Sequence, residues 1–270
     1  MNPASPAQKT SQPQRTPLFE VRKVSKHFGG LIAVHNMSLS IYPGTIAGLI
    51  GPNGAGKTTF FNLMSGLYTP DGGEFLFKGD VFSPKAPEEV AKMGIARTFQ
   101  NIRLFSSMTA LENIMVGCHC RYRHGVLGAI FKTRSHRQEE HSIREKSRAL
   151  LDYVGIARYA DELAGHLSYG DQRRLEIARA LATQPDLLAL DEPAAGMNAT
   201  EKLRLKELLL QMRTDGKTIL LIEHDVKLVM GICDHVTVLD YGKVIEEGSP
   251  KKVQQSPAVI EAYLGGLHHA

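Results

Sequence analysis

Short apolar runs bounded by glycine and proline occupy the first part of the chain and return in its last third. Runs of this length with turn-forming residues at both ends predict β-strands. In chain order, the predicted strands are residues 19–24, 32–41, 45–50, 73–78, 187–190, 218–222, 236–239 and 244–246. The last two are joined through Tyr241-Gly242, so they predict a hairpin near the end of the chain.

The middle of the chain has a helical pattern from about residue 104 to residue 183. Within it, a charged segment carries a stripe of apolar residues at helical spacing: Ile143, Leu150, Leu151 and Val154. Two shorter helices are predicted at residues 59–67, where Gly66 ends the helix, and at residues 202–212. Because strands alternate with helices, the pattern predicts an α/β fold with a parallel sheet.

A glycine-rich loop lies between the strand at 45–50 and the helix at 59–67. It matches the phosphate-binding P-loop, G-x-x-x-x-G-K-[ST], with residues Gly51, Pro52, Asn53, Gly54, Ala55, Gly56, Lys57, Thr58 and Thr59. Glycines let backbone N–H groups turn inward around phosphate oxygens, and the helix N-terminus favours the same anion. Lys57 supplies a positive charge for the phosphates, and Thr58 supplies a hydroxyl for Mg²⁺. The loop therefore predicts binding of a nucleoside triphosphate.

An acidic pair, Asp191-Glu192, directly follows the apolar run at 187–190. Carboxylates at the end of a buried strand suit phosphoryl transfer. Asp191 can hold Mg²⁺ through water, and Glu192 can orient or deprotonate the attacking water. The alternative is a strand that ends in a solvated acidic turn. The P-loop earlier in the chain favours the catalytic interpretation.

Another helix start is marked by residues 167–175, Leu-Ser-Tyr-Gly-Asp-Gln-Arg-Arg-Leu, which we call the signature segment. Ser168 is a suitable N-cap, and Asp171 follows at the third position beyond it. This spacing is the Asp form of a capping box. A well-capped helix explains these two residues but leaves Gly170 without a role.

Charge and cysteine content exclude few functions. The net charge of +4 is too small to indicate nucleic-acid binding, although residues 119–148 carry eight Lys and Arg against three Asp and Glu. This basic stretch can be a solvated helical face, or it can contact anionic lipid or a partner protein. Three cysteines provide no paired framework, which indicates reduced structural thiols.

The sequence predicts no membrane-spanning segment. Residues 1–17 are rich in Pro, Ser, Gln and Thr, which predicts a disordered tail rather than a secretory signal. Residues 27–56 contain no Lys, Arg, Asp or Glu, but Pro43, Pro52 and many glycines exclude a membrane-spanning helix. We therefore expect a protein that is soluble or is held at a membrane by partners.

Together, these motifs resemble those of the ATP-binding cassette (ABC) ATPases, from about residue 19 to residue 264. The shared features, in chain order, are the P-loop, Gln100 of Thr-Phe-Gln, the signature segment, Asp191-Glu192, and His224 of Ile-Glu-His-Asp. A narrower group, the ATPases of high-affinity branched-chain amino-acid importers of the LivG type, is similar at residues 167–179, 191–198, 222–230 and 262–265. That group also has extra residues at the position of the basic stretch.

The resemblance implies a P-loop NTPase (RecA-like) core with a parallel sheet, an antiparallel β subdomain and an inserted α-helical subdomain. We expect a single nucleotide-binding domain at residues 18–266, with the helical subdomain at about residues 101–183. Short tails are expected at residues 1–17 and 267–270.

The resemblance also implies that two ATPase subunits pair head to tail, with ATP between the P-loop of one and the signature segment of the other. Besides its own P-loop, ATP would contact Val34 and Phe28, whose ring could stack on adenine or could simply pack. In the other subunit, ATP would contact Ser168, Tyr169, Gly170 and Asp171. The implied catalytic residues are Glu192, His224 and Lys57, and the implied Mg²⁺ ligands are Thr58, Gln100 and Asp191.

Two residues depart from most ABC ATPases, which have Gln at the position of Asp171 and Asp at the position of Asn198. Both departures are typical of the narrower group, so they do not indicate lost activity. A carboxylate directed at phosphate would be repelled. We therefore expect Asp171 to turn back toward the cap at Ser168.

The implied partners are two membrane permeases, contacted near residues 101–105, a second ATPase subunit of the same or a sister chain and, indirectly, a solute-binding protein. Nucleic acid is not an expected partner. The expected activity is ATP hydrolysis coupled to uptake of branched-chain amino acids at the cytoplasmic face of the inner membrane. Urea, an amide or another amino acid is an alternative substrate. A soluble ABC ATPase would usually carry two cassettes or a long coiled coil, and a regulatory cassette would not need the intact Lys57 and Glu192.

Overall fold

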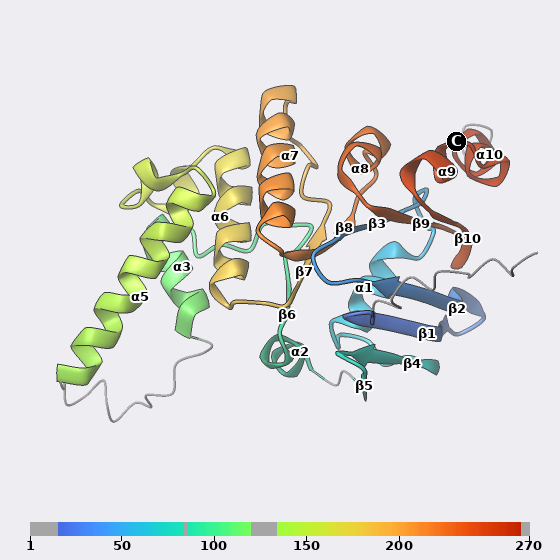
Figure 1. Ribbon diagram of the computed structural model, residues 1–270, viewed down its shortest axis with the longest axis horizontal. Helices are drawn as coiled ribbons and strands as arrows, with labels where there is room; N and C mark the ends of the chain where they lie inside the picture. The colour runs from blue at the N-terminus through green and yellow to red at the C-terminus, as the bar shows by residue number, and fades with distance from the viewer. Residues whose placement is uncertain (1–15, 84–85, 120–133, 266–270) are drawn as a thin grey trace, which may run out of the picture.

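Two β-sheets organise the residues that the computed structural model describes, 16–83, 86–119 and 134–265 (Figure 1). The first sheet is antiparallel, with the order β2-β1-β4-β5. Its strands are β1 (Phe19–Phe28), β2 (Leu31–Ile41), β4 (Gly72–Phe77) and β5 (Asp80–Phe82). The second sheet has the order β10-β9-β3-β8-β7-β6 and is parallel except where β10 pairs with β9. Its strands are β3 (Ile46–Ile50), β6 (Ile95–Arg97), β7 (Leu187–Asp191), β8 (Thr218–Ile222), β9 (His235–Asp240) and β10 (Lys243–Gly248).

The central strands of the second sheet are buried on both faces. Every residue of β3, β7 and β8 is buried, as their unbroken apolar sequences predict. Successive residues point to opposite faces. Along β3, Ile46 and Ile50 therefore join one hydrophobic core, while Ala47 and Leu49 join another. The first core lies toward the helices and the second lies toward the antiparallel sheet, so the parallel sheet is fixed from both sides.

The helices of this core connect or follow the strands: α1 (Lys57–Met64), α2 (Pro87–Met93), α7 (Ala199–Thr214), α8 (Val226–Ile232), α9 (Pro250–Gln254) and α10 (Pro257–Gly265). α7 begins earlier than the predicted residue 202 because Asn198 caps it. The Asn198 side chain accepts a hydrogen bond from the Glu201 N–H, and the Glu201 carboxylate accepts one from the Asn198 N–H, both at 3.0 Å. This is a full capping box, and Asn caps a helix as well as Asp does.

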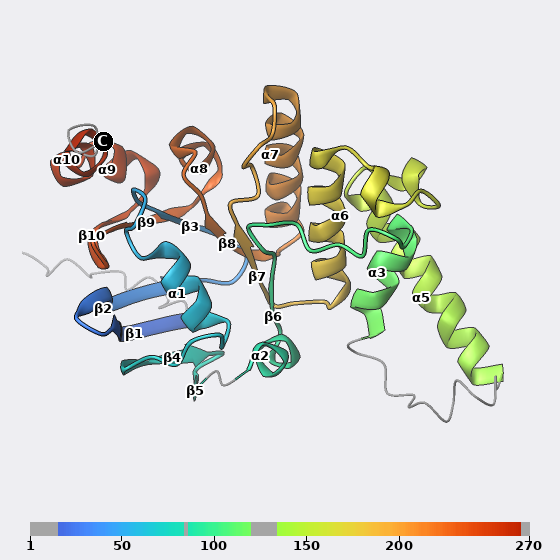
Figure 2. The ribbon, with the colours of Figure 1, turned by 180° about the vertical axis from the view of Figure 1, so that it is seen from behind.

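A second group of helices lies at one end of the molecule, away from the antiparallel sheet (Figures 1 and 2). It comprises α3 (Ala110–His119), α5 (Arg134–Tyr153) and α6 (Tyr169–Ala182), with short 3-10 turns η1 (Ala157–Tyr159) and η2 (Ala164–His166). In the predicted stripe, Ile143, Leu151 and Val154 are buried, and Leu150 packs against the same core. The helical pattern is therefore confirmed for the described part of this stretch, at residues 110–119, 134–153 and 169–182.

These sheets and helices confirm the predicted α/β fold class. Residues 1–15 and 266–270 and the basic residues at 120–133 lie outside the described part of the chain. Within the described part, no helix is long and apolar enough to cross a membrane.

Candidate functional site

Three neighbouring strands of the parallel sheet end side by side, and each leads into a predicted motif. β3 leads into the P-loop, β7 ends at Asp191, and β8 leads into Glu223 and His224. The register places Ile222 of β8 beside Leu49 on one side and beside Asp191 on the other. Carboxyl ends of parallel strands form the usual ligand edge of an α/β sheet. Segments far apart in the sequence therefore meet at this edge.

The P-loop is held against the backbone of other elements. A Cβ atom at Gly51 would collide with the Leu239 carbonyl oxygen of β9, and one at Gly56 would collide with the Ala33 carbonyl oxygen of β2. Only glycine permits these approaches. The predicted hairpin turn also contributes, because the Gly242 N–H donates to the Ala55 carbonyl at 2.9 Å. The loop is thus shaped by contacts from both sheets.

Lys57 begins α1, and its ammonium group lies inside the curve of the loop. Nζ donates to the carbonyl oxygens of Gly51 at 2.6 Å and Pro52 at 2.9 Å. Burial lowers the pKa of Lys57, while the nearby Glu192 and Asp191 carboxylates oppose this shift. Neutral carbonyls hold the ammonium, so a triphosphate can replace them with stronger, charge-assisted hydrogen bonds.

Glu192 lies close to the side chains of two other predicted site residues, Gln100 and His224. Its Oε2 accepts a hydrogen bond from Gln100 Nε2 at 3.1 Å and lies 3.6 Å from His224 Nδ1. The His224 side chain is 55% exposed, and that of Glu192 is 21% exposed. A carboxylate that is oriented on one side and reachable by solvent has the arrangement that a general base requires.

The predicted Mg²⁺ ligands are hard oxygen donors that fit a cation shared with nucleotide phosphates. Asp191 is buried, and this burial raises its pKa to about 6, helped by Glu192 and Glu223 and opposed by Arg97 and Arg173. The described residues contain no cluster of three His, Cys, Asp or Glu able to hold a metal by themselves. Mg²⁺ usually needs only one or two protein carboxylates when phosphates and water supply the rest. Asp191 with Thr58 and Gln100 matches that pattern.

Glu223 is a buried residue of the site that the sequence analysis did not assign. Its carboxylate accepts hydrogen bonds from the N–H groups of Ala194 at 2.7 Å, His224 at 3.2 Å and Asp225 at 3.4 Å. Burial raises its pKa, and these bonds oppose the shift. Glu223 therefore ties the segment that follows Glu192 to the segment that carries His224. A glutamate directly after an unbroken apolar strand was the available sequence signal.

The C-terminal helix α10 also contacts the P-loop. The Tyr263 hydroxyl is buried and has no well-aligned hydrogen-bond partner in the described structure. Burial raises the pKa of Tyr263 to about 12, and the backbone N–H of Gly51 opposes this shift. Residues 262–265 resemble the narrower ATPase group, and this contact gives that segment a place beside the nucleotide loop.

The two remaining residues predicted to bind ATP in the same chain differ in exposure. Phe28, at the end of β1, is 43% exposed, and its ring meets that of Tyr68 edge-on at a centroid distance of 5.3 Å. Its surface is therefore open to a stacking partner. Val34 is fully buried in the core beneath the antiparallel sheet. Its predicted contact with ATP remains a prediction.

The signature segment lies apart from the P-loop of the same chain, because α6 and α1 stand on opposite sides of α7 in both views (Figures 1 and 2). The predicted cap is confirmed: Ser168 Oγ accepts from the Asp171 N–H at 3.2 Å and donates to Asp171 Oδ2 at 2.8 Å. Asp171 also pairs with Arg174. The carboxylate therefore turns back to the cap, as we expected.

The four residues predicted to reach a second subunit's ATP are not equally accessible. Ser168 and Tyr169 are exposed, whereas Gly170 and Asp171 are buried in their own chain. A Cβ atom at Gly170 would come within 2.7 Å of Glu201 Oε1 in the capping box of α7. Close packing against α7 thus gives Gly170 an intramolecular role that the sequence did not indicate.

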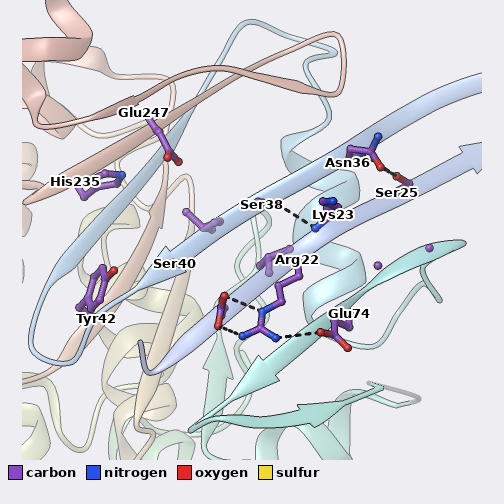
Figure 3. Close-up of a pocket in the computed structure, with 15 residues that line it drawn as sticks. Arg22, Lys23, Ser25, Asn36, Ser38, Ser40, Tyr42, Glu74, His235 and Glu247 are labelled. Carbon is purple, nitrogen blue, oxygen red and sulfur yellow. Dashed lines mark hydrogen bonds and ion pairs between the residues drawn. The ribbon is translucent and has the colours of Figure 1, made fainter. Parts of the chain in front are cut away.

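A wide cavity of about 930 Å³ lies elsewhere, between the antiparallel sheet and the edge formed by β9 and β10 (Figure 3). On the antiparallel sheet, Arg22 pairs with Glu20 at 2.8 Å and with Glu74 at 3.3 Å, while His235 and Glu247 line the cavity from the other sheet. None of its lining residues belongs to the P-loop, the acidic pair or the signature segment. The catalytic chemistry therefore lies at the strand ends and not in this cavity.

A P-loop at the end of a buried parallel strand, with an acidic pair at the end of a nearby strand, defines a P-loop ATPase. Comparison with known proteins identifies the family. The family model described as "ABC transporter" matches residues 34–195, and a second, described as "Branched-chain amino acid ATP-binding cassette transporter", matches residues 243–269. The chain is 45% identical to the high-affinity branched-chain amino acid transport ATP-binding protein LivG of Escherichia coli (strain K12), over 92% of this chain and 98% of that protein.

Similar solved structures belong to the same family. One, the ADP conformation of MJ1267, an ATP-binding cassette of an ABC transporter, has a TM-score of 0.81 at 33% identity and covers 93% of this chain and 99% of that chain. Another, a dimeric structure of a post-hydrolysis state of the ATP-binding cassette MJ0796 bound to ADP and Pi, has a TM-score of 0.71 at 26% identity, covering 86% and 98%. The chain belongs to the ABC transporter ATPases, which hydrolyse ATP, and the resemblance drawn from the motifs is confirmed.

Proposed function

We propose that this chain hydrolyses ATP for an importer of branched-chain amino acids. The convergence of Lys57, Gln100, Glu192 and His224 at one edge of the sheet is the observation that carries the ATPase activity. The match at residues 243–269 and the similarity to LivG over most of the chain support the substrate. Two permeases, a second ATPase subunit and, indirectly, a solute-binding protein complete the importer, and the chain lies at the cytoplasmic face of the inner membrane.

The triphosphate lies over the P-loop, where the N-terminus of α1 favours an anion. Lys57 exchanges its carbonyl partners for phosphate oxygens. Thr58, Gln100 and Asp191 would hold Mg²⁺, which would neutralise charge on the phosphate oxygens when bound. Phe28 offers its exposed ring to the adenine base.

Glu192 takes a proton from the attacking water. Its hydrogen bond from Gln100 orients the carboxylate, and its own backbone N–H is fixed by the Ile222 carbonyl at 2.8 Å. His224, exposed beside Glu192, stabilises the charge that develops on the transferred phosphoryl group.

A second subunit completes each nucleotide site. Ser168 and Tyr169 are exposed at the capped N-terminus of α6, a position that favours anions, and they lie apart from the P-loop of their own chain. A head-to-tail pair brings them to the triphosphate of the partner chain. The solved structure of the ATP-binding cassette MJ0796 bound to ADP and Pi is dimeric, which supports a pair of subunits.

A groove beside the catalytic edge suits a permease segment. It has a volume of about 560 Å³, and its lining includes Ala91, Phe99, Arg103, Phe105, Val116 and Arg179. Phe105 is 47% exposed, and its loop is held by the buried Asn113, which accepts from the Phe105 N–H at 2.9 Å and donates to the Phe105 carbonyl at 3.1 Å. Aromatic rings flanked by arginines suit an apolar segment that carries an acidic residue. The groove includes part of the expected permease contact at residues 101–105.

The proposal is tested by purifying the tagged full chain from solubilised membranes and reconstituting what accompanies it into vesicles. We expect two permeases and a second ATPase subunit, with ATP-driven uptake of leucine when solute-binding protein is supplied. Lys57→Ala in the same complex should abolish uptake without dissociating the subunits. Uptake of urea without leucine would contradict the substrate, and a chain that brings no permease would contradict the transport function.

A further inference from the structure

Arg173 is a fully buried cation in the first half of α6. Its Nη1 donates to the Phe99 carbonyl at 2.6 Å, and its Nη2 donates to the Gln100 carbonyl at 2.7 Å. Burying a charge is costly unless its hydrogen bonds are satisfied. These contacts therefore fix the backbone that carries Gln100, a residue of the catalytic edge, to the helix that begins within the signature segment.

Glu176 completes the attachment from the same face of α6. It accepts a hydrogen bond from Arg173 Nη1 at 2.8 Å, and only 2% of its side chain is exposed. Its other oxygen accepts from the N–H groups of Phe99 at 3.4 Å and Arg103 at 3.5 Å. Arg173 and Glu176 thus hold the backbone of residues 99–103 together: Arg173 binds two of its carbonyl groups, and Glu176 binds two of its N–H groups.

Arg173 also contacts Tyr169, the exposed residue that would face the second subunit. Nη2, which holds the Gln100 carbonyl, donates in addition to the Tyr169 hydroxyl at 3.1 Å. Tyr169 is 42% exposed and belongs to the signature segment. On the other side, the Gln100 side chain donates to Glu192 at 3.1 Å. Tyr169, Arg173, Gln100 and Glu192 therefore form one continuous chain of contacts.

We propose that Arg173 is a positioning residue through which contact of Tyr169 with a second subunit's nucleotide site adjusts Gln100 and Glu192 in the chain's own site. This inference rests on the proposed head-to-tail dimer. A guanidinium is a rigid planar fork, so movement of one bonded nitrogen moves the other. The Arg173 Nε atom is buried without a hydrogen-bond partner in the described structure. A reorientation of the fork that gave Nε an acceptor would offset the loss of another of its hydrogen bonds.

The test measures the rate of ATP hydrolysis at increasing ATP concentrations. Light scattering on the same samples shows whether the chain forms a dimer. We expect the wild-type chain to form a dimer with ATP and to hydrolyse it with a Hill coefficient above one, approaching the number of sites. Tyr169→Phe, which removes only the hydroxyl, should reduce the coefficient to about one while the dimer still forms. Tyr153→Phe is the matched control, because Tyr153 donates to Asp215 outside this chain of contacts and should leave the coefficient unchanged.

A second variant tests Arg173 itself. Arg173→Met combined with Glu176→Gln leaves no unpaired buried charge, so we expect it to fold with little change in melting temperature. Loss of the fork should lower kcat by roughly tenfold to a hundredfold through misplacement of Gln100, and the Hill coefficient should fall to about one.

The outcomes separate the two proposals. A wild-type chain that neither dimerises nor shows cooperativity, by itself or with the second ATPase subunit recovered from the complex, would contradict the dimer and this inference together. A cooperative wild-type dimer whose cooperativity survives in Tyr169→Phe, or in the folded double variant, would overturn the role of Arg173 alone.

Discussion

Glu192 has a left-handed backbone conformation, with φ of 46°. Outside glycine this conformation costs roughly 1–2 kcal/mol, so other contacts must stabilise it. The hydrogen bond from its N–H to the Ile222 carbonyl of β8 provides such a contact at 2.8 Å. The sequence identified this carboxylate but not its conformation, because the residue that holds it lies in another strand.

At the same scale, Glu223 should be a stabilising residue. Glu223→Ala removes the acceptor from three backbone N–H groups in a buried place, so we expect it to lower the free energy of unfolding by about 3 kcal/mol. Urea denaturation measures the change. Glu207→Ala, at an exposed position of α7, is the control and should change it by less than about 0.5 kcal/mol. A loss below about 1 kcal/mol in Glu223→Ala would contradict the assigned contacts.

Asp71 provides a prediction about pH. The Lys26 ammonium at 2.9 Å, followed by the His27 N–H at 2.6 Å, lowers its pKa to about 2 from the usual 3.8. A lowered carboxyl pKa stabilises the fold above pH 3.8, and this contribution is lost as the pH falls toward 2. NMR titration of the Asp71 carboxyl should show this low midpoint, and Lys26→Met should raise it. A midpoint near 3.8 in the wild-type chain would show that these contacts do not form in solution.

At the scale of elements, hydrophobic pattern predicted the strands that carry the site. Because β3, β7 and β8 are buried on both faces, each is an unbroken apolar run that the sequence reveals within a residue or two. The strands β5 and β6 have only three residues each, too few to show a period, and were missed. α1 begins at Lys57 rather than at residue 59 because the loop itself closes the first helical turn, with the Phe60 N–H bonded to the Gly56 carbonyl.

The candidate site was predictable where its chemistry is carried by contiguous motifs. Lys57, Asp191, Glu192 and the Ser168 cap belong to such motifs. The contacts that position them were not predictable, because they join distant residues: Arg173 and Phe99 are 74 positions apart. The spacing of residues within a short motif cannot indicate a contact between residues so far apart in the sequence.

The groove beside the catalytic edge gives a prediction at this scale. Phe105→Ser should weaken recovery of the permeases with the chain, because it removes the exposed ring. ATP hydrolysis by the isolated chain should stay unchanged, since Phe105 lies outside the catalytic group. Tyr42→Ser, a change at an exposed aromatic residue outside the groove, is the matched control and should retain the permeases. Full recovery of permeases with Phe105→Ser would exclude the groove as their contact.

At the scale of the whole molecule, the proposed function requires one chain to present two halves of different nucleotide sites. The P-loop edge carries Lys57 and Glu192, and the N-terminus of α6 carries Ser168 and Tyr169 on the other side of α7. The P-loop alone indicates only a nucleotide binder. Because the P-loop lies apart from the exposed signature residues, the proposed function needs a pair of subunits.

In the proposed mechanism, Glu192 activates the attacking water but is not needed for ATP binding. The most direct measurement is ATP binding and ATP turnover by Glu192→Gln, with Glu207→Gln as the control at an exposed position. We predict ATP affinity within about threefold of the wild-type chain and turnover reduced roughly a hundredfold or more, because the amide cannot accept the proton. Turnover near the wild-type rate in Glu192→Gln would contradict the account.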